Sequence, residues 1–134
     1  MPVSLQTDFM APESSHLRFT ILEHDHPFLH WDLLMQQGKS LATWRLLQKP
    51  GKGYWIPSEK LPDHRLIYLD YEGPVSGGRG HATQFCTGNF AFSSVEVVEG
   101  EVAVDKAFRL SDCELGTKAF CRFYNTDKPE WRFE

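Results

Sequence analysis

A histidine and an aspartate separated by one residue, His30 and Asp32, are the side chains of this sequence most suited to hold a metal ion. Residues 29–35 alternate, with His30, Asp32 and Leu34 in one set and Leu29, Trp31, Leu33 and Met35 in the other. Such alternation predicts a strand with one apolar face, so both polar side chains should project from the opposite face. His24 precedes a predicted turn at residues 25–27 that would return it to the same place. Two imidazoles and one carboxylate form a metal-ligand set with open positions.

A purely structural interpretation of these residues stays open, in which Asp32 only orients a core histidine. A second stretch, residues 64–71, also alternates and places His64 and Tyr68 on one face. A histidine and a phenol on one face form a candidate substrate-side pair, because both groups can donate hydrogen bonds to a substrate. The structural alternative for this pair is that both residues cap one end of a barrel.

Length and composition predict one compact domain. The chain has 134 residues, 41% of them hydrophobic, which is enough to bury a core without disulfides. A formal net charge of −4 excludes a strongly basic nucleic-acid-binding surface, so such contacts would need a local patch or a metal ion. The cysteines, Cys86, Cys113 and Cys121, show no Cys-x-x-Cys spacing and predict reduced, mostly structural thiols.

The N-terminal residues 1–15 are predicted to be a mobile arm that precedes a single domain at residues 16–134. This arm has neither a basic start nor an apolar run, so neither a signal peptide nor a membrane span is predicted. We therefore expect a cytoplasmic protein.

The elements that must position these side chains are short strands. No segment has a sustained helical period, and alternating runs recur at turn spacing, which predicts an all-β fold: a compact barrel of about eight strands with long loops. Barrel closure would create a mouth for the site. Residues 48–63 predict a long loop, and Gly88-Asn89 predicts a hairpin turn. The expected strands are residues 17–22, 29–35, 41–47, 64–71, 81–87, 90–98, 101–110, 117–124 and 131–134.

Several of these residues resemble a known family. The run from His24 to Asp32, then Trp44, then Asp63-His64 with Tyr68, then residues 71–80, is similar to the 3′-phosphoesterase domain of bacterial DNA ligase D. The resemblance spans residues 19–90. It implies a compact β-barrel, here free-standing, and a manganese-dependent activity. That activity removes 3′-phosphates and 3′-terminal ribonucleotides from primer–template DNA.

The resemblance also implies roles for individual residues. His24, His30 and Asp32 would ligate a divalent metal, Mn²⁺ in the first place with Zn²⁺ as the alternative, and His64 and Tyr68 would contact the scissile phosphate. The implied partners are DNA 3′ ends and a separately encoded ligase or polymerase.

The sequence departs from the family at three positions: Leu34 replaces an arginine that grips the phosphate, Leu22 replaces a glutamine, and Pro62 replaces an acidic residue. Leucine cannot donate a hydrogen bond, so the missing arginine needs a substitute. Arg79, in a glycine-rich loop, is the first candidate for phosphate binding, and Arg45 on the adjacent strand is the second.

Two other functions stay open. Without a substitute arginine, the chain would be a catalytically degenerate member that binds nucleic-acid ends or a protein partner. In the other alternative, His30, Asp32 and His64 would ligate iron, as in oxygenases with two histidines and one carboxylate, and His24 would take no part.

Overall fold

The computed structural model describes residues 17–93 and 104–134, which form one antiparallel sheet. The predicted arm at residues 1–15 lies outside the described residues, as do residues 94–98 and 101–103 of two expected strands. The elements are β1 (Leu17–His24), β2 (His30–Gln37), β3 (Ser40–Leu46), β4 (Trp55–Arg65), the 3₁₀ helix η1 (Leu66–Leu69), β5 (Gly73–Pro74), β6 (His81–Ser93), β7 (Lys106–Ser111), β8 (Lys118–Arg122) and β9 (Glu130–Phe133).

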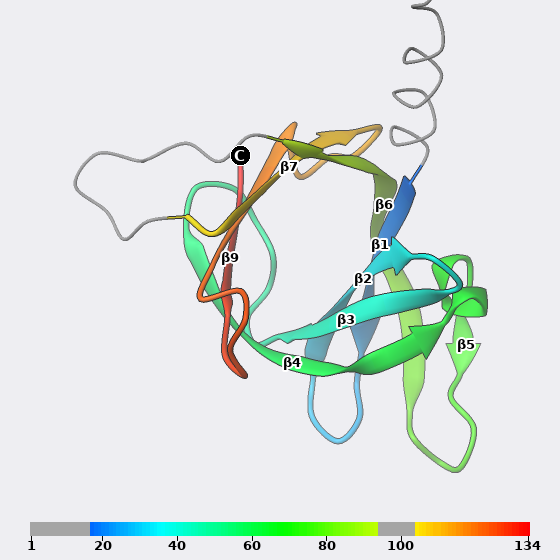
Figure 1. Ribbon diagram of the computed structural model, residues 1–134. Coiled ribbons are helices and arrows are strands. Elements are labelled where there is room, and N and C mark those ends of the chain that lie inside the picture. Colours follow the sequence, from blue (N-terminus) through cyan, green and yellow to red (C-terminus); the bar gives the residue numbers. More distant parts are fainter. Residues whose placement is uncertain (1–16, 94–103) are drawn as a thin grey trace, which may run out of the picture.

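Eight of the strands close into a barrel, which confirms the predicted fold class. The strand order is β1-β2-β3-β4-β9-β8-β7-β6, and β6 pairs back onto the whole length of β1 (Figure 1). The short β5 pairs with the start of β6, outside the closed ring. In the described part of the chain η1 is the only helix, and no helix there is long and apolar enough to cross a membrane.

The sheet buries apolar side chains on both of its faces. The larger cluster takes residues from every long strand and fills the barrel, with Trp31, Leu33, Trp44 and Trp131 among its members. A smaller cluster lies on the outer face of β1, β2, β3 and β6, where η1 covers the sheet; its buried members are Leu22, Leu34, Leu41, Leu69 and Ala82. Because β2 is covered on both sides, its first six residues are all buried.

This arrangement decides where the polar site lies. Along β2 the side chains of Trp31 and Leu33 belong to the interior cluster, so His30, Asp32 and Leu34 face outward. The expectation of a site at the barrel mouth is therefore wrong. The site lies on the outer wall of the barrel, beside the segment that carries η1.

The predicted loop at residues 48–63 holds for residues 48–54 but is wrong beyond them, because β4 begins at Trp55. Its Pro62 is tolerated because the pairing of β3 with β4 shifts register there, between Leu41 and Thr43. A residue at such a bulge need not donate a ladder hydrogen bond, which proline cannot do. The expected strand at residues 64–71 is also wrong, since β4 ends at Arg65 and η1 follows.

Gly88 does not form the predicted hairpin turn with Asn89, because both lie inside β6. A Cβ atom at Gly88 would lie 2.7 Å from the carbonyl oxygen of Ser111 and 3.0 Å from the Cβ atom of Cys113. The glycine therefore permits a close approach of two chain segments, which is a common role of glycine within a strand.

Candidate metal centre

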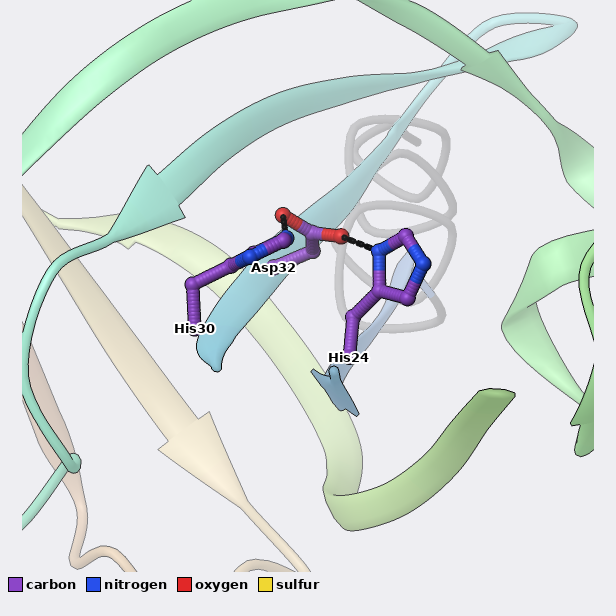
Figure 2. Close-up of side chains that lie close together, drawn as sticks. All are labelled: His24, His30 and Asp32. Atoms are coloured by element: carbon purple, nitrogen blue, oxygen red, sulfur yellow. Dashed lines mark ion pairs between the residues drawn. The ribbon is translucent and has the colours of Figure 1, made fainter. Parts of the chain in front are cut away.

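The β1–β2 hairpin brings the three predicted ligands together. In its register His24 lies opposite His30, and Leu22 lies opposite Asp32. Residues 25–29 make the turn, so the return of His24 to the His30 and Asp32 face occurs as expected. The two imidazole rings lie 4.9 Å apart between centroids, with the carboxylate of Asp32 between them (Figure 2).

The donor atoms of this group converge closely. Nδ1 of His24 lies 3.5 Å from one carboxylate oxygen of Asp32, and Nε2 of His30 lies 3.2 Å from the other (Figure 2). The ligand atoms of the three residues all lie within 4.8 Å of one another, so the group could hold a metal ion. In the described ranges 17–93 and 104–134, it is the one group of this kind.

Two backbone carbonyls set the orientation of both imidazoles. Nδ1 of His30 donates to the carbonyl oxygen of Phe28 at 2.8 Å, and Nε2 of His24 donates to the carbonyl oxygen of Arg79 at 2.7 Å. A neutral ring carries its proton on the nitrogen that donates, so the lone pair of each ring is on the other nitrogen. Both lone pairs therefore face Asp32. Metal-binding histidines are typically held in this way by a carbonyl or carboxylate.

The polar atoms of the centre fit a cation. Nε2 of His30 and Oδ1 of Asp32 are buried and have no hydrogen-bond partner among the residues that the structure describes. Their 3.2 Å contact joins two acceptors when His30 carries its proton on Nδ1. A buried polar atom without a partner costs about 1–3 kcal/mol. A divalent ion between these atoms would satisfy both.

The ionisation state of Asp32 also suits metal binding. Burial raises the pKa of Asp32, but its contacts with His24 and His30 outweigh burial and lower that pKa to about 2. In turn, Asp32 raises the pKa of His24 despite the partial burial of that ring, because its carboxylate accepts a hydrogen bond from the imidazolium form. Asp32 is therefore an anion at neutral pH, as a carboxylate ligand must be.

The metal group lines a groove of about 530 Å³ that also contains the expected substrate-side pair. His64 lies in β4 and Tyr68 in η1, not on one strand as expected. The centroids of their rings nevertheless lie 5.9 Å apart, because the helical turn of η1 brings Tyr68 back toward His64. His64 lies outside the metal group, and its Nδ1 bonds to the carbonyl oxygen of Pro62 at 3.1 Å.

Both candidate arginines line the groove, but their surroundings differ. Arg79 donates from Nε to the carbonyl oxygen of Ser76 at 2.7 Å and from Nη2 to its hydroxyl at 3.1 Å. Arg45 lies directly opposite Asp32 across the β2–β3 ladder. Its Nη1 lies 3.8 Å from the carboxylate of Glu59, which is beyond hydrogen-bond distance, and its guanidinium lies 5.4 Å from the centre of the Phe28 ring. Arg45 therefore keeps donor capacity beside the metal group, whereas Arg79 uses its donors within its own loop.

Leu34 is not available to a substrate, contrary to the expectation that it faces the site. Its side chain is 0% exposed and packs in the outer cluster with Leu22, Leu41 and Leu69. Leu69 belongs to η1, which is distant from β2 in the sequence. The pattern of β2 alone therefore could not show that Leu34 is covered.

We expect Leu34→Arg to lower the free energy of unfolding by at least about 3 kcal/mol, because it would bury an uncompensated charge. The matched control is Leu34→Met, which conserves volume and should cost less than about 1.5 kcal/mol. Urea unfolding of both variants measures the difference. Equal stability of the two variants would show that Leu34 is not enclosed as described.

Gly80 adjoins the carbonyl that orients His24. Its φ is +80°, and an added Cβ would overlap Asp25 and approach the Cβ atom of His26 to 2.6 Å. Gly80→Ala should therefore displace the neighbouring Arg79 carbonyl and weaken metal binding by about 10–100-fold, the usual loss for an outer partner of a ligand.

Gly78→Ala is the control for this change. Gly78 also has a left-handed φ, +69°, but apart from its two chain neighbours no described residue has an atom within 4 Å of the added Cβ. Calorimetric titration with Mn²⁺ should give near-wild-type affinity for Gly78→Ala. If both variants bind equally well, the Arg79 carbonyl does not support the centre.

Sequence reasoning missed the two carbonyls, of Phe28 and Arg79, that hold the imidazoles. No side-chain signal could have found them, because every residue carries a carbonyl. His26 and His81, the remaining histidines near the site, are exposed. His81 contributes through its backbone, since its N–H donates to Asp25 at 2.7 Å and ties the β1–β2 turn to β6.

Comparison with known proteins adds no assignment. No protein-family model matches this sequence, and no curated protein matches it. The function must therefore be argued from the groove and its chemistry.

Proposed function

We propose that this protein is a metal-dependent phosphoesterase that acts on DNA 3′ ends and removes a 3′-phosphate or a 3′-terminal ribonucleotide. The observation that carries this proposal is the juxtaposition of the His24, His30 and Asp32 group with Arg45 in one groove. A cation site next to a guanidinium suits an anionic phosphate. The choice of DNA 3′ ends comes from the resemblance to the 3′-phosphoesterase domain of DNA ligase D.

The proposed metal is Mn²⁺, which accepts imidazole and carboxylate ligands; Zn²⁺ fits the same donors. His24 would bind through Nδ1, His30 through Nε2 and Asp32 through its carboxylate. When bound, a divalent ion polarises a phosphoryl oxygen or lowers the pKa of a bound water. With one carboxylate ligand the centre carries a net positive charge, which would attract a phosphate to an acidic chain.

The groove residues supply the remaining contacts. Arg45 donates its guanidinium N–H groups to the non-bridging oxygens of the phosphate. His64 keeps one proton on Nδ1, toward the carbonyl of Pro62, so its Nε2 can carry the proton that passes to the leaving oxygen. Tyr68, whose ring adjoins that of His64, donates its hydroxyl proton in a hydrogen bond to the transition state.

In this proposal the protein works in the cytoplasm and prepares 3′-hydroxyl ends for a separately encoded ligase or polymerase. A second candidate function is non-catalytic binding of nucleic-acid ends. The observation that favours it is the buried Leu34 in the position of the family arginine. The two functions differ in whether a bound 3′ end is changed.

A labelled primer–template assay tests the proposal. Metal-loaded protein is incubated with primers that end in a 3′-phosphate, in one 3′-ribonucleotide or in a 3′-hydroxyl, and the products are separated by gel electrophoresis. We expect the first two primers to be converted, the 3′-hydroxyl primer to remain intact, and a chelator to stop conversion. Retention of the primer in a protein–DNA complex without conversion would instead establish the non-catalytic function.

A further inference from the structure

Two thiols that look merely structural in the sequence lie in direct contact. The Sγ atoms of Cys86 and Cys113 are 3.1 Å apart. Cys86 lies in β6, Cys113 follows β7, and each residue is half-buried and not enclosed in the core. A disulfide requires about 2.05 Å between sulfurs, so a displacement of about 1 Å would join them.

The fold holds this pair in place through neighbouring contacts. The β6–β7 ladder ends with Asn89 opposite Ser111. Beyond it, the side-chain amide of Asn89 donates to the carboxylate of Asp112 at 3.0 Å. The absence of a side chain at Gly88 leaves room for Cys113 to approach β6. The contact between the two sulfur atoms therefore follows from the β6–β7 register, the hydrogen bond of Asn89 with Asp112 and the space left at Gly88.

The two thiols have unequal surroundings. The thiol of Cys86 stabilises a Cys113 thiolate, the N–H of Leu115 donates to the Cys113 sulfur at 3.3 Å, and together they lower the pKa of Cys113 to about 7. The contact with Cys113, together with burial, raises the pKa of Cys86. A thiolate is the reactive form of cysteine, so Cys113 is the attacking group and Cys86 the resolving group.

We propose that Cys86 and Cys113 form a reversible redox pair that a peroxide converts into an intramolecular disulfide. The Cys113 thiolate attacks one peroxide oxygen, the O–O bond breaks, and the departing hydroxide takes up a proton, which leaves a sulfenic acid on Cys113. The sulfur of Cys86 then attacks the Cys113 sulfur, the S–O bond breaks, and the departing hydroxide takes the Cys86 proton as water. Overall, two thiols lose two electrons and two protons, and hydrogen peroxide becomes two waters.

This pair is independent of the proposed phosphoesterase site. Cys86 and Cys113 pack against the interior cluster, whereas His24 and Asp32 lie on the outer face of the same wall. The disulfide would join β6 to the segment after β7 and shorten the free loop of the unfolded chain. We therefore expect the oxidised protein to melt at a temperature several degrees higher, roughly 5 °C or more.

Peptide mapping of the wild-type protein tests the proposal directly, because trypsin places each cysteine in a different peptide: Cys86 in residues 80–106, Cys113 in residues 110–118 and Cys121 in residues 119–122. The protein is treated with hydrogen peroxide, alkylated after unfolding and digested. We expect the first two peptides to be cross-linked, the cross-link to disappear with a reductant, and Cys121 to be alkylated. Three alkylated cysteines, or a cross-link that involves Cys121, would overturn the proposal.

Single variants then separate the two roles. In Cys86→Ser, Cys113 should accumulate as a sulfenic acid that dimedone traps, whereas Cys113→Ser should show no comparable adduct on Cys86. Cys121→Ala is the control, because Cys121 is fully buried in the core and its pKa is raised by that burial. It should form the cross-link at the wild-type rate. Equal dimedone labelling of Cys86 and Cys113 in the two serine variants would refute the assigned roles.

Discussion

Asp32→Asn should bind a divalent metal at least about 100-fold more weakly than the wild-type protein. Substitution of a residue that only supports a ligand typically weakens metal binding by about 10–100-fold, and loss of a ligand itself should weaken it further. Asp32 is the sole carboxylate of the group, and two neutral imidazoles hold a hard cation poorly. Asparagine has nearly the same shape as aspartate, so the hairpin should keep its register. Calorimetric titration with Mn²⁺ and elemental analysis after metal loading measure the loss.

Asp63→Asn provides the matched control. Asp63 lines the same groove, but it is exposed and accepts a hydrogen bond from Ser40 at 2.9 Å instead of facing the imidazoles. Its substitution should leave metal affinity near the wild-type value. If Asp32→Asn retains the wild-type metal content, the assignment of Asp32 as a ligand is wrong.

Arg45→Ala should lower kcat on a 3′-phosphate primer by about 10²–10³-fold, the range for loss of one transition-state donor. Its metal affinity should not change, because Arg45 is not among the three ligands. Arg45→Lys keeps the charge but lacks the planar fork, so it should recover only part of the turnover. Steady-state kinetics with metal-saturated protein checks both variants.

Arg79→Ala separates the two arginines. The guanidinium of Arg79 bonds to Ser76, and the group that orients His24 is the Arg79 backbone carbonyl, which alanine retains. We therefore expect a smaller loss of turnover than for Arg45→Ala. Wild-type kcat in Arg45→Ala together with a large loss in Arg79→Ala would assign the phosphate contact to Arg79 instead.

Local alternation was sufficient to predict the all-β class and the common face of His30 and Asp32, because a period of two survives in a strand that is buried on both sides. The proximity of His24 also followed from a local feature, the turn that joins β1 to β2. These predictions needed no knowledge of distant contacts.

Features that depend on distant segments could not be predicted in this way. Pro62 suggested a loop, yet a register shift against β3 accommodates it. Leu34 looked like a site residue, yet Leu69 of η1 helps to cover it. The contact of Cys86 with Cys113 depends on the β6–β7 register. In each case tertiary pairing outweighs the local pattern.

Anomalous diffraction from crystals grown with Mn²⁺ would test the central claim, that His24, His30 and Asp32 form a metal centre. We expect one anomalous peak within coordination distance, roughly 2.0–2.4 Å, of Nδ1 of His24, Nε2 of His30 and a carboxylate oxygen of Asp32. A peak ligated by His30, Asp32 and His64 without His24, or no peak at this group, would contradict the claim.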